Sequence, residues 1–129
     1  MKAKQDQVEN QTRRNRLFQA SVIVILILAL APGNGKVSIV YFDKFIHFSM
    51  FLALSINACY RYRKDSKRLE VLIWIILFGL LIEVAQQFVP HRDMDLYDGI
   101  ADTIGVIAGY YLYRNNQIKL DKLILKLGA

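Results

Sequence analysis

An imidazole and two carboxylates, those of His47, Glu83 and Asp102, interrupt strongly apolar stretches of this sequence. Such groups exchange protons near neutral pH and also ligate divalent cations such as Mg²⁺, Mn²⁺ or Zn²⁺. If the three side chains meet in the folded chain, the sequence predicts acid–base catalysis or metal binding there. The structural alternative is a hydrogen-bonded cluster that only fixes the register of neighbouring helices.

Other polar side chains near these three are candidates for substrate binding. Asp43 and His47 are four residues apart, so they lie on one helix face, about 6 Å from each other. The guanidinium of Arg92 suits a phosphate or carboxylate, which it binds in a bidentate way. For Lys44 and Asp98 a solvated position at a helix end is the simpler interpretation. The candidate substrate-binding residues are Asp43, Lys44, Gln86, Arg92 and Asp98.

Four apolar runs must position these side chains, in a chain of 129 residues that is 54% hydrophobic. They cover residues 17–31, 45–60, 69–89 and 100–113. Each is close to the length of a bilayer-spanning helix, although only the third reaches about 20 residues. A soluble four-helix bundle is the alternative, but residues 22–31 and 71–82 have no polar face for water. The sequence therefore predicts an all-α integral membrane bundle of four transmembrane helices.

Basic residues predict the orientation of these spans, because positively charged loops stay in the cytoplasm. Most of the seventeen Lys and Arg residues lie before the first run, between the second and third, and after the fourth. Both termini are therefore expected in the cytoplasm, and the polar candidates at the outer face of the lipid bilayer. The net charge of +6 is explained by this topology, so nucleic acid is not expected as a partner.

The two ends of the chain are expected to differ from the membrane domain, residues 17–114. Residues 1–16 are too polar to bury and are expected to form a mobile cytoplasmic segment. In the cytoplasmic tail, residues 115–129, leucine and isoleucine recur at helical spacing between lysines. This pattern predicts a short amphipathic helix on the inner leaflet.

One stripe on the fourth predicted helix combines acids and glycines. Asp98, Asp102, Gly105 and Gly109 fall within an arc of about 60° at helical geometry. The glycines permit close approach of another helix, either within the chain or from a second copy in an oligomer. The two carboxylates, about 6 Å apart, resist being ionised together. A cation or protonated His47 would neutralise one of them, or Asp102 would keep its proton.

Four short motifs resemble the signature blocks of the VanZ-like family of bacterial membrane proteins. They are DKFIH at 43–47, EVAQ at 83–86, PHR at 90–92 and DGIADTIGVIAG at 98–109. Asp102 stands where the family usually has Asn, which favours a neutral, protonated Asp102. The resemblance implies a small multi-pass protein of the bacterial cytoplasmic membrane. It also implies a link to antibiotic resistance, because the founding member is tied to resistance to the glycopeptide teicoplanin.

Two classes of function follow from these residues and from the resemblance. The first is a binding or accessory role at the cell envelope, in which an outward-facing polar pocket holds a glycan, a lipid-linked precursor or a glycopeptide. The alternative is a membrane-embedded enzyme that acts on a lipid-linked or cell-envelope substrate by acid–base or metal-assisted chemistry. Its catalytic residues would be His47, Glu83 and Asp102. Transport is less favoured, because the inner halves of the helices offer few polar side chains.

Overall fold

The computed structural model describes residues 1–33, 40–63 and 66–127, which form four α-helices and no strands. Helix α1 spans Lys2–Leu30, α2 spans Val40–Arg61, α3 spans Arg68–Gln86 and α4 spans Leu96–Lys126. The all-α prediction is therefore confirmed for the described part of the chain.

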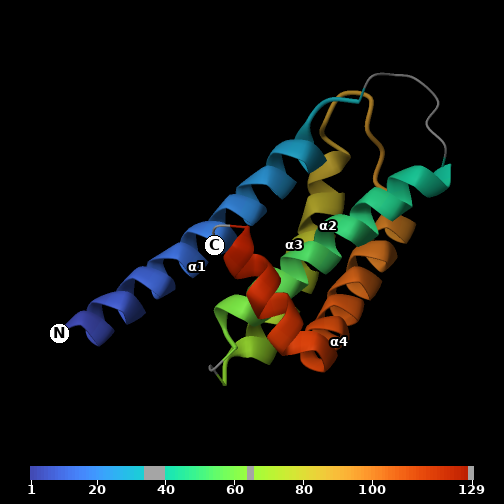
Figure 1. Cartoon of the computed structure of the whole chain (residues 1–129). Coiled ribbons are helices and arrows are strands. Elements are labelled where there is room, and N and C mark those ends of the chain that lie inside the picture. The colour runs from blue at the N-terminus through green and yellow to red at the C-terminus, as the bar shows by residue number, and fades with distance from the viewer. Residues whose placement is uncertain (34–39, 64–65, 128–129) are drawn as a thin grey trace.

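Successive helices run in opposite directions, so the bundle has two distinct ends (Figure 1). The chain leaving α1 and the α3–α4 connection meet at one of them, where the backbone N–H of Gly33 donates to the carbonyl of Pro90 over 3.0 Å. We call this the Asp95 end. The chain leaves α2 at the opposite end, which we call the Arg63 end.

Helices α2 and α4 form the closest pair in the bundle. A Cβ atom added at Gly105 would lie 2.5 Å from the carbonyl oxygen of Phe48, and one added at Gly109 would lie 2.7 Å from that of Leu52. Such distances leave no room for a side chain at either position. The glycine face is therefore covered by α2 of the same chain.

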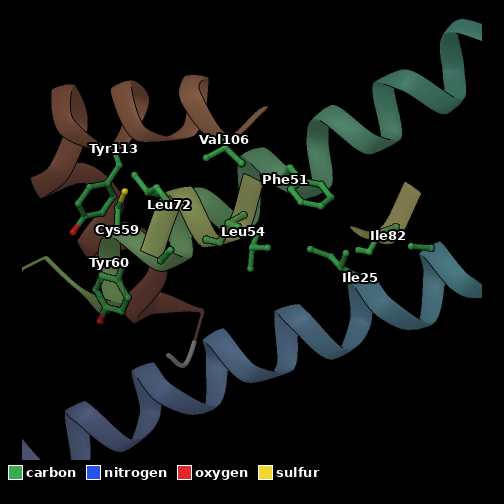
Figure 2. Packing of buried hydrophobic residues seen from close by; sticks show 12 residues of the cluster. Ile25, Phe51, Leu54, Cys59, Tyr60, Leu72, Ile82, Val106 and Tyr113 are labelled. Atoms are coloured by element: carbon green, nitrogen blue, oxygen red, sulfur yellow. The ribbon is translucent and has the colours of Figure 1, made fainter. Parts of the chain in front are cut away.

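The apolar core follows α2 through the bundle (Figure 2). Phe51 and Leu54 of α2 are almost fully buried. Val106 of α4 lies on one side of them, and Ile82 of α3 and Ile25 of α1 lie on the other. Tyr113 and Cys59 close the core toward the Arg63 end. Dispersion contacts among these side chains hold the helices together in any solvent.

Large apolar side chains also cover the outside of the bundle. On α3 alone, Trp74 is 63% exposed and Leu81 is 67% exposed. Among the described residues, α3 is the one helix that is long and apolar enough to cross a membrane. Polar side chains such as His47 and Asp102 interrupt the apolar windows of α2 and α4. The prediction of four transmembrane helices is therefore not confirmed by length and composition.

Helix boundaries differ from the sequence prediction in two places. Residues 1–16, expected as a mobile segment, are helical from Lys2 onward, where α1 begins. This segment is rich in Gln, Glu, Lys and Arg, which are good helix formers, and it continues the apolar helix without a break. It is mostly exposed, as its polarity requires. Helix α3 ends at Gln86 rather than at residue 89, since a proline at position 90 disfavours helical conformation before it.

Helix α4 is bent where the membrane domain was expected to end. Asn116 has a non-helical conformation, with φ −127° and ψ 25°. Beyond it the chain turns back toward α1 (Figure 1). Leu120 and Ile124 pack against the core, whereas Leu123 and Leu127 are exposed. A short C-terminal helix is thus present after the bend, and half of its apolar stripe is used within the protein.

Candidate functional site

His47 lies at the Asp95 end, between helices α2, α3 and α4, and is 2% exposed. Its Nδ1 atom is 3.0 Å from Oδ1 of Asp102 and 3.7 Å from Oε1 of Glu83. Its Nε2 atom is 3.8 Å from Oδ2 of Asp98. The structure therefore brings together the three residues that interrupt the apolar runs. Together with Asp98 and Lys44, they make up the five side chains that we call the His47 cluster.

Helix α4 supplies both aspartates of the cluster from one face. Asp98 and Asp102 are four residues apart, which places them one turn from each other on the side that meets α2. Asp95 caps the N-terminus of this helix, since its side chain accepts the backbone N–H of Tyr97 at 2.8 Å. The backbone N–H of Asp95 donates to Oε2 of Glu83 over 3.3 Å. The start of α4 is thus fixed to the end of α3.

Lys44 joins the cluster to the molecular surface. Its ammonium group donates to Oδ2 of Asp95 at 2.6 Å and to Oδ1 of Asp98 at 3.2 Å. The hydrogen bond from Lys44 holds the pKa of Asp95 below its ordinary value. Asp43 lies half-buried at the edge of the same group, close enough to His47 and Asp98 to share a ligand with them. Lys44 is partly exposed, as expected for a solvated helix end, whereas Asp98 is buried.

Two carboxylate oxygens in the cluster lack partners. Oε1 of Glu83 and Oδ2 of Asp102 accept no hydrogen bond from any described residue, and both side chains are 1% exposed. A buried oxygen without a partner loses its hydration and gains nothing in return. The cluster also holds three carboxylates against one ammonium and one imidazole. It is therefore short of positive charge or of hydrogen-bond donors.

The cluster is closed. His47, Glu83 and Asp102 are each at most 2% exposed, so no open pocket leads to these three side chains. The sequence predicted an outward-facing polar pocket at this position. The described residues instead form an enclosed polar centre. Lys44 is the most exposed residue of the cluster, and Asp95, its partner outside the cluster, is more exposed still.

Gln86 and Arg92, two of the predicted substrate-binding residues, lie elsewhere. The side-chain amide of Gln86 donates to the carbonyl of Ala29 at 2.9 Å. Arg92 donates from Nε to the carbonyl of Ala31 at 3.0 Å and from Nη2 to that of Leu28 at 3.3 Å. These carbonyls at the end of α1 have no partner within their own helix. In this conformation both side chains fasten α1 to the α3–α4 connection.

Two residues at the site were not selected from the sequence. Asp95 supports Glu83 through its backbone and Lys44 through its side chain. Gly79 leaves space beside Asp102, because a Cβ atom there would lie 3.2 Å from Oδ2. Gly79 is four residues before Glu83, and this spacing places both on one face of α3. That spacing was the available signal for Gly79.

The donor atoms of the cluster fall into two groups that could hold a metal ion. In each group the atoms lie within 4.8 Å of one another. One group is His47, Glu83 and Asp102, all buried, and the other is Asp43, His47 and Asp98.

Comparisons with known proteins agree with the motifs. The family described as VanZ/LLP1 matches residues 3–120, which include all four helices. An uncharacterized protein of Schizosaccharomyces pombe is 23% identical over 118 residues, covering 84% of this chain and 73% of that protein. No solved structure matches the chain.

Proposed function

Since the chain belongs to the VanZ/LLP1 family, we propose that it is a multi-pass membrane protein of the cell envelope, with the His47 cluster as its functional site. The observation that carries this proposal is the distribution of polarity across α3. Trp74 and Leu81 face outward at more than 60% exposure, while Glu83 on the same helix is buried. An apolar exterior around ionisable groups suits a lipid solvent, and intramembrane ionisable residues usually serve a function.

The proposed topology has four spans, with both termini in the cytoplasm. It is supported by basic residues, which gather at the Arg63 end of the bundle and in the segment before residue 17. Residues 17–114 form the membrane domain, residues 1–16 extend α1 into the cytoplasm, and residues 115–129 form the cytoplasmic tail. In this orientation the Asp95 end faces outward from the bacterial cytoplasmic membrane.

The proposed role is binding or assistance at the envelope, linked to glycopeptide resistance as in the founding member of the VanZ-like proteins. The ligand is a cell-envelope glycan, a lipid-linked precursor or a glycopeptide such as teicoplanin. It meets the cluster from the side of Lys44, whose ammonium lies 6.0 Å from the ring centre of the exposed Tyr97. A charged group beside an aromatic face suits a sugar or a phosphate.

A membrane-embedded enzyme is the second candidate, and one observation favours it. The imidazole of His47 has a carboxylate near each of its two ring nitrogens, Asp102 at Nδ1 and Asp98 at Nε2. This arrangement suits a histidine that takes up a proton on one side and is oriented from the other. The substrate would again be a lipid-linked or cell-envelope compound.

A cytoplasm-dependent reporter tests the topology. It should be active when fused after Arg63 and silent when fused after Asp95. Activity after Asp95 would place the His47 cluster inside the cell and contradict a role at the envelope.

Comparison of cells with and without the protein tests the role. Loss of the protein should increase susceptibility to teicoplanin, and Glu83→Gln should have the same effect as loss. Glu70→Gln, which changes an exposed glutamate of the same helix, should have none. Envelope lipid and muropeptide profiles separate the two candidates, because an enzyme alters a covalent structure and an accessory protein does not.

A further inference from the structure

Oε1 of Glu83, which has no partner among the described residues, and Oδ1 of Asp102 lie near the same nitrogen of His47, at 3.7 Å and 3.0 Å from Nδ1. We propose that Nδ1 of His47 and one carboxylate oxygen each from Glu83 and Asp102 hold a divalent transition-metal cation, Zn²⁺ or Mn²⁺. This inference deepens the proposed function, since it assigns a ligand to the same cluster.

The spacing of the donor atoms fits such an ion. Nδ1 of His47 is 3.0 Å from Oδ1 of Asp102 and 3.7 Å from Oε1 of Glu83. A tetrahedral ion with nitrogen and oxygen ligands at about 2.0–2.2 Å keeps its ligand atoms about 3.4 Å apart. The two distances from Nδ1 thus differ from that separation by only about 0.3–0.4 Å, and the three donor atoms all lie within 4.8 Å of one another.

Each carboxylate presents one oxygen toward Nδ1 of His47, which is Oε1 for Glu83 and Oδ1 for Asp102. Oε2 of Glu83 accepts the backbone N–H of Asp95, which leaves Oε1 without a partner. Asp102 has one oxygen beside His47, and Oδ2 points toward the space left by Gly79. Both carboxylates are 1% exposed, so bulk water does not satisfy the remaining lone pairs.

The second nitrogen of His47 has the environment expected of a metal ligand. When Nδ1 binds an ion, Nε2 carries the proton, and Oδ2 of Asp98 lies 3.8 Å away as its acceptor. The other oxygen of Asp98 is held by Lys44 at 3.2 Å. Carboxylates in this position orient metal-bound histidines and raise their basicity. The 3.8 Å between Nε2 and Oδ2 of Asp98 is longer than a hydrogen bond, and this distance is expected to shorten to hydrogen-bonding length when the ion binds.

Protons alone satisfy the cluster less well. A proton on Asp102 supplies one hydroxyl donor, which can serve either Nδ1 of His47 or Oε1 of Glu83 but not both. If His47 carried both protons, Nδ1 would serve Asp102 but remain 3.7 Å from Glu83, beyond hydrogen-bonding distance. A cation at the centre of the three groups satisfies all of them together.

The donor set favours transition metals over Mg²⁺. One imidazole nitrogen with two carboxylate oxygens suits Zn²⁺ or Mn²⁺, whereas Mg²⁺ prefers octahedral oxygen ligands and retains several waters. Three protein ligands also leave a coordination position for a water molecule or a ligand oxygen.

Metal analysis of the full chain in detergent tests the proposal. The protein is stripped with a chelator, reloaded with Zn²⁺, Mn²⁺ or Mg²⁺ in separate arms, desalted and measured by plasma mass spectrometry. Zn²⁺ or Mn²⁺ should bind at one equivalent and raise the melting temperature, whereas Mg²⁺ should do neither. Glu83→Gln and Asp102→Asn should each abolish stoichiometric binding, and Asp98→Asn should weaken it by about 10- to 100-fold.

Matched variants control for folding and for surface binding. Glu70→Gln and Asp93→Asn remove exposed carboxylates and should keep one equivalent of metal. Circular dichroism verifies that each variant is helical, and Asp102→Asn carries the test if Glu83→Gln does not fold. Absence of stoichiometric metal in the parent, or full metal in a folded Asp102→Asn, would overturn the proposal. Loss of teicoplanin resistance in Glu83→Gln without any metal in the parent would overturn the cation alone and leave the proposed function intact.

Discussion

The two ends of the bundle each hold a polar cluster, and among the described residues the two differ in whether a buried carboxylate oxygen or the Nε of Arg63 lacks a partner. At the Arg63 end, Asp121 accepts a hydrogen bond from the hydroxyl of Tyr113 at 2.6 Å and one from Arg63 at 2.8 Å. Both of its oxygens are used, and one negative charge meets one positive charge. We call these three residues the Asp121 cluster. In the His47 cluster, Glu83 and Asp102 each retain an oxygen without a partner.

The difference separates a structural role from a functional one. Stability alone explains the Asp121 cluster, since it fixes the C-terminal part of α4 to the end of α2. Stability does not explain the His47 cluster, because unpaired buried oxygens cost free energy. Proteins keep such costs where a ligand or a reaction requires them. The comparison therefore supports the proposal that the functional site lies at the Asp95 end.

The largest expected effect is on function, at Glu83. Glu83→Gln should abolish the cell-level phenotype, while chelator-treated protein gains or keeps stability, by up to about 1–3 kcal/mol, because an unpaired buried charge disappears. Unfolding in detergent and teicoplanin susceptibility measure the two effects. Wild-type susceptibility in a folded Glu83→Gln protein would remove the distinction between the clusters.

The contact between α2 and α4 should be the next most sensitive feature. Gly105→Ala forces a methyl group against the backbone of Phe48, next to His47, and should cost about 1–3 kcal/mol. It should also move His47 away from Asp102 and lower metal content. Gly109→Ala makes a similar clash one turn away from the cluster, against Leu52. It should cost comparable stability and retain more metal, which unfolding and metal analysis together can show.

The opposite result is expected for Asp121→Asn. This change removes the charge that serves Arg63 and weakens the bond from Tyr113, so it should cost about 1–2 kcal/mol, since Arg63 is partly exposed. Metal content and teicoplanin susceptibility should stay at parental values. Loss of function with stability unchanged would mean that the Asp121 cluster also takes part in the activity.

A smaller effect is expected at Arg92. In the structure this side chain supports α1, so Arg92→Ala should lower stability by about 1 kcal/mol and leave bound metal unchanged. From the sequence, Arg92 was expected to act with His47 and Glu83 on a substrate. Full stability combined with complete loss of the phenotype would restore that interpretation.

The smallest effect should come from Asp95→Asn. Asparagine still caps α4, so the change isolates the ion pair with Lys44, which is partly exposed and worth less than about 1 kcal/mol. Because the pKa of Asp95 is lowered in the folded protein, the advantage of the parent should be present above about pH 4 and vanish as the pH falls through the folded-state value. Unfolding of both proteins across this range provides the measurement. An advantage that grows on acidification would contradict the assignment.

The pattern of apolar and ionisable residues predicted the helices and the core of the candidate site. Apolar runs predicted the helices, and the cost of isolated ionisable groups predicted that His47, Glu83 and Asp102 would meet. The orientation of the Arg92 side chain toward α1 was not predictable, because the α3–α4 connection has no helical periodicity that would assign its side chains to a face. The partners of this side chain are backbone carbonyls, which every residue carries. Gly105 was consistent with contacts within or between chains, and only the position of Phe48 decides between them.

The principal partner of α2 is α4, which follows it in the chain only after α3. Under the proposed multi-pass topology, with helices inserted one at a time, His47 enters the membrane with no carboxylate from α4 beside it. The hydroxyl of Ser55 also lacks its acceptor at that stage, because it donates to the carbonyl of Val106 on α4, at 2.7 Å in the folded protein. The intermediate with α1, α2 and α3 in place therefore exposes a polar face, which the insertion machinery or water must cover. Biogenesis of this protein should depend on rapid delivery of α4, and chains that stop before Leu96 should be degraded rather than accumulate.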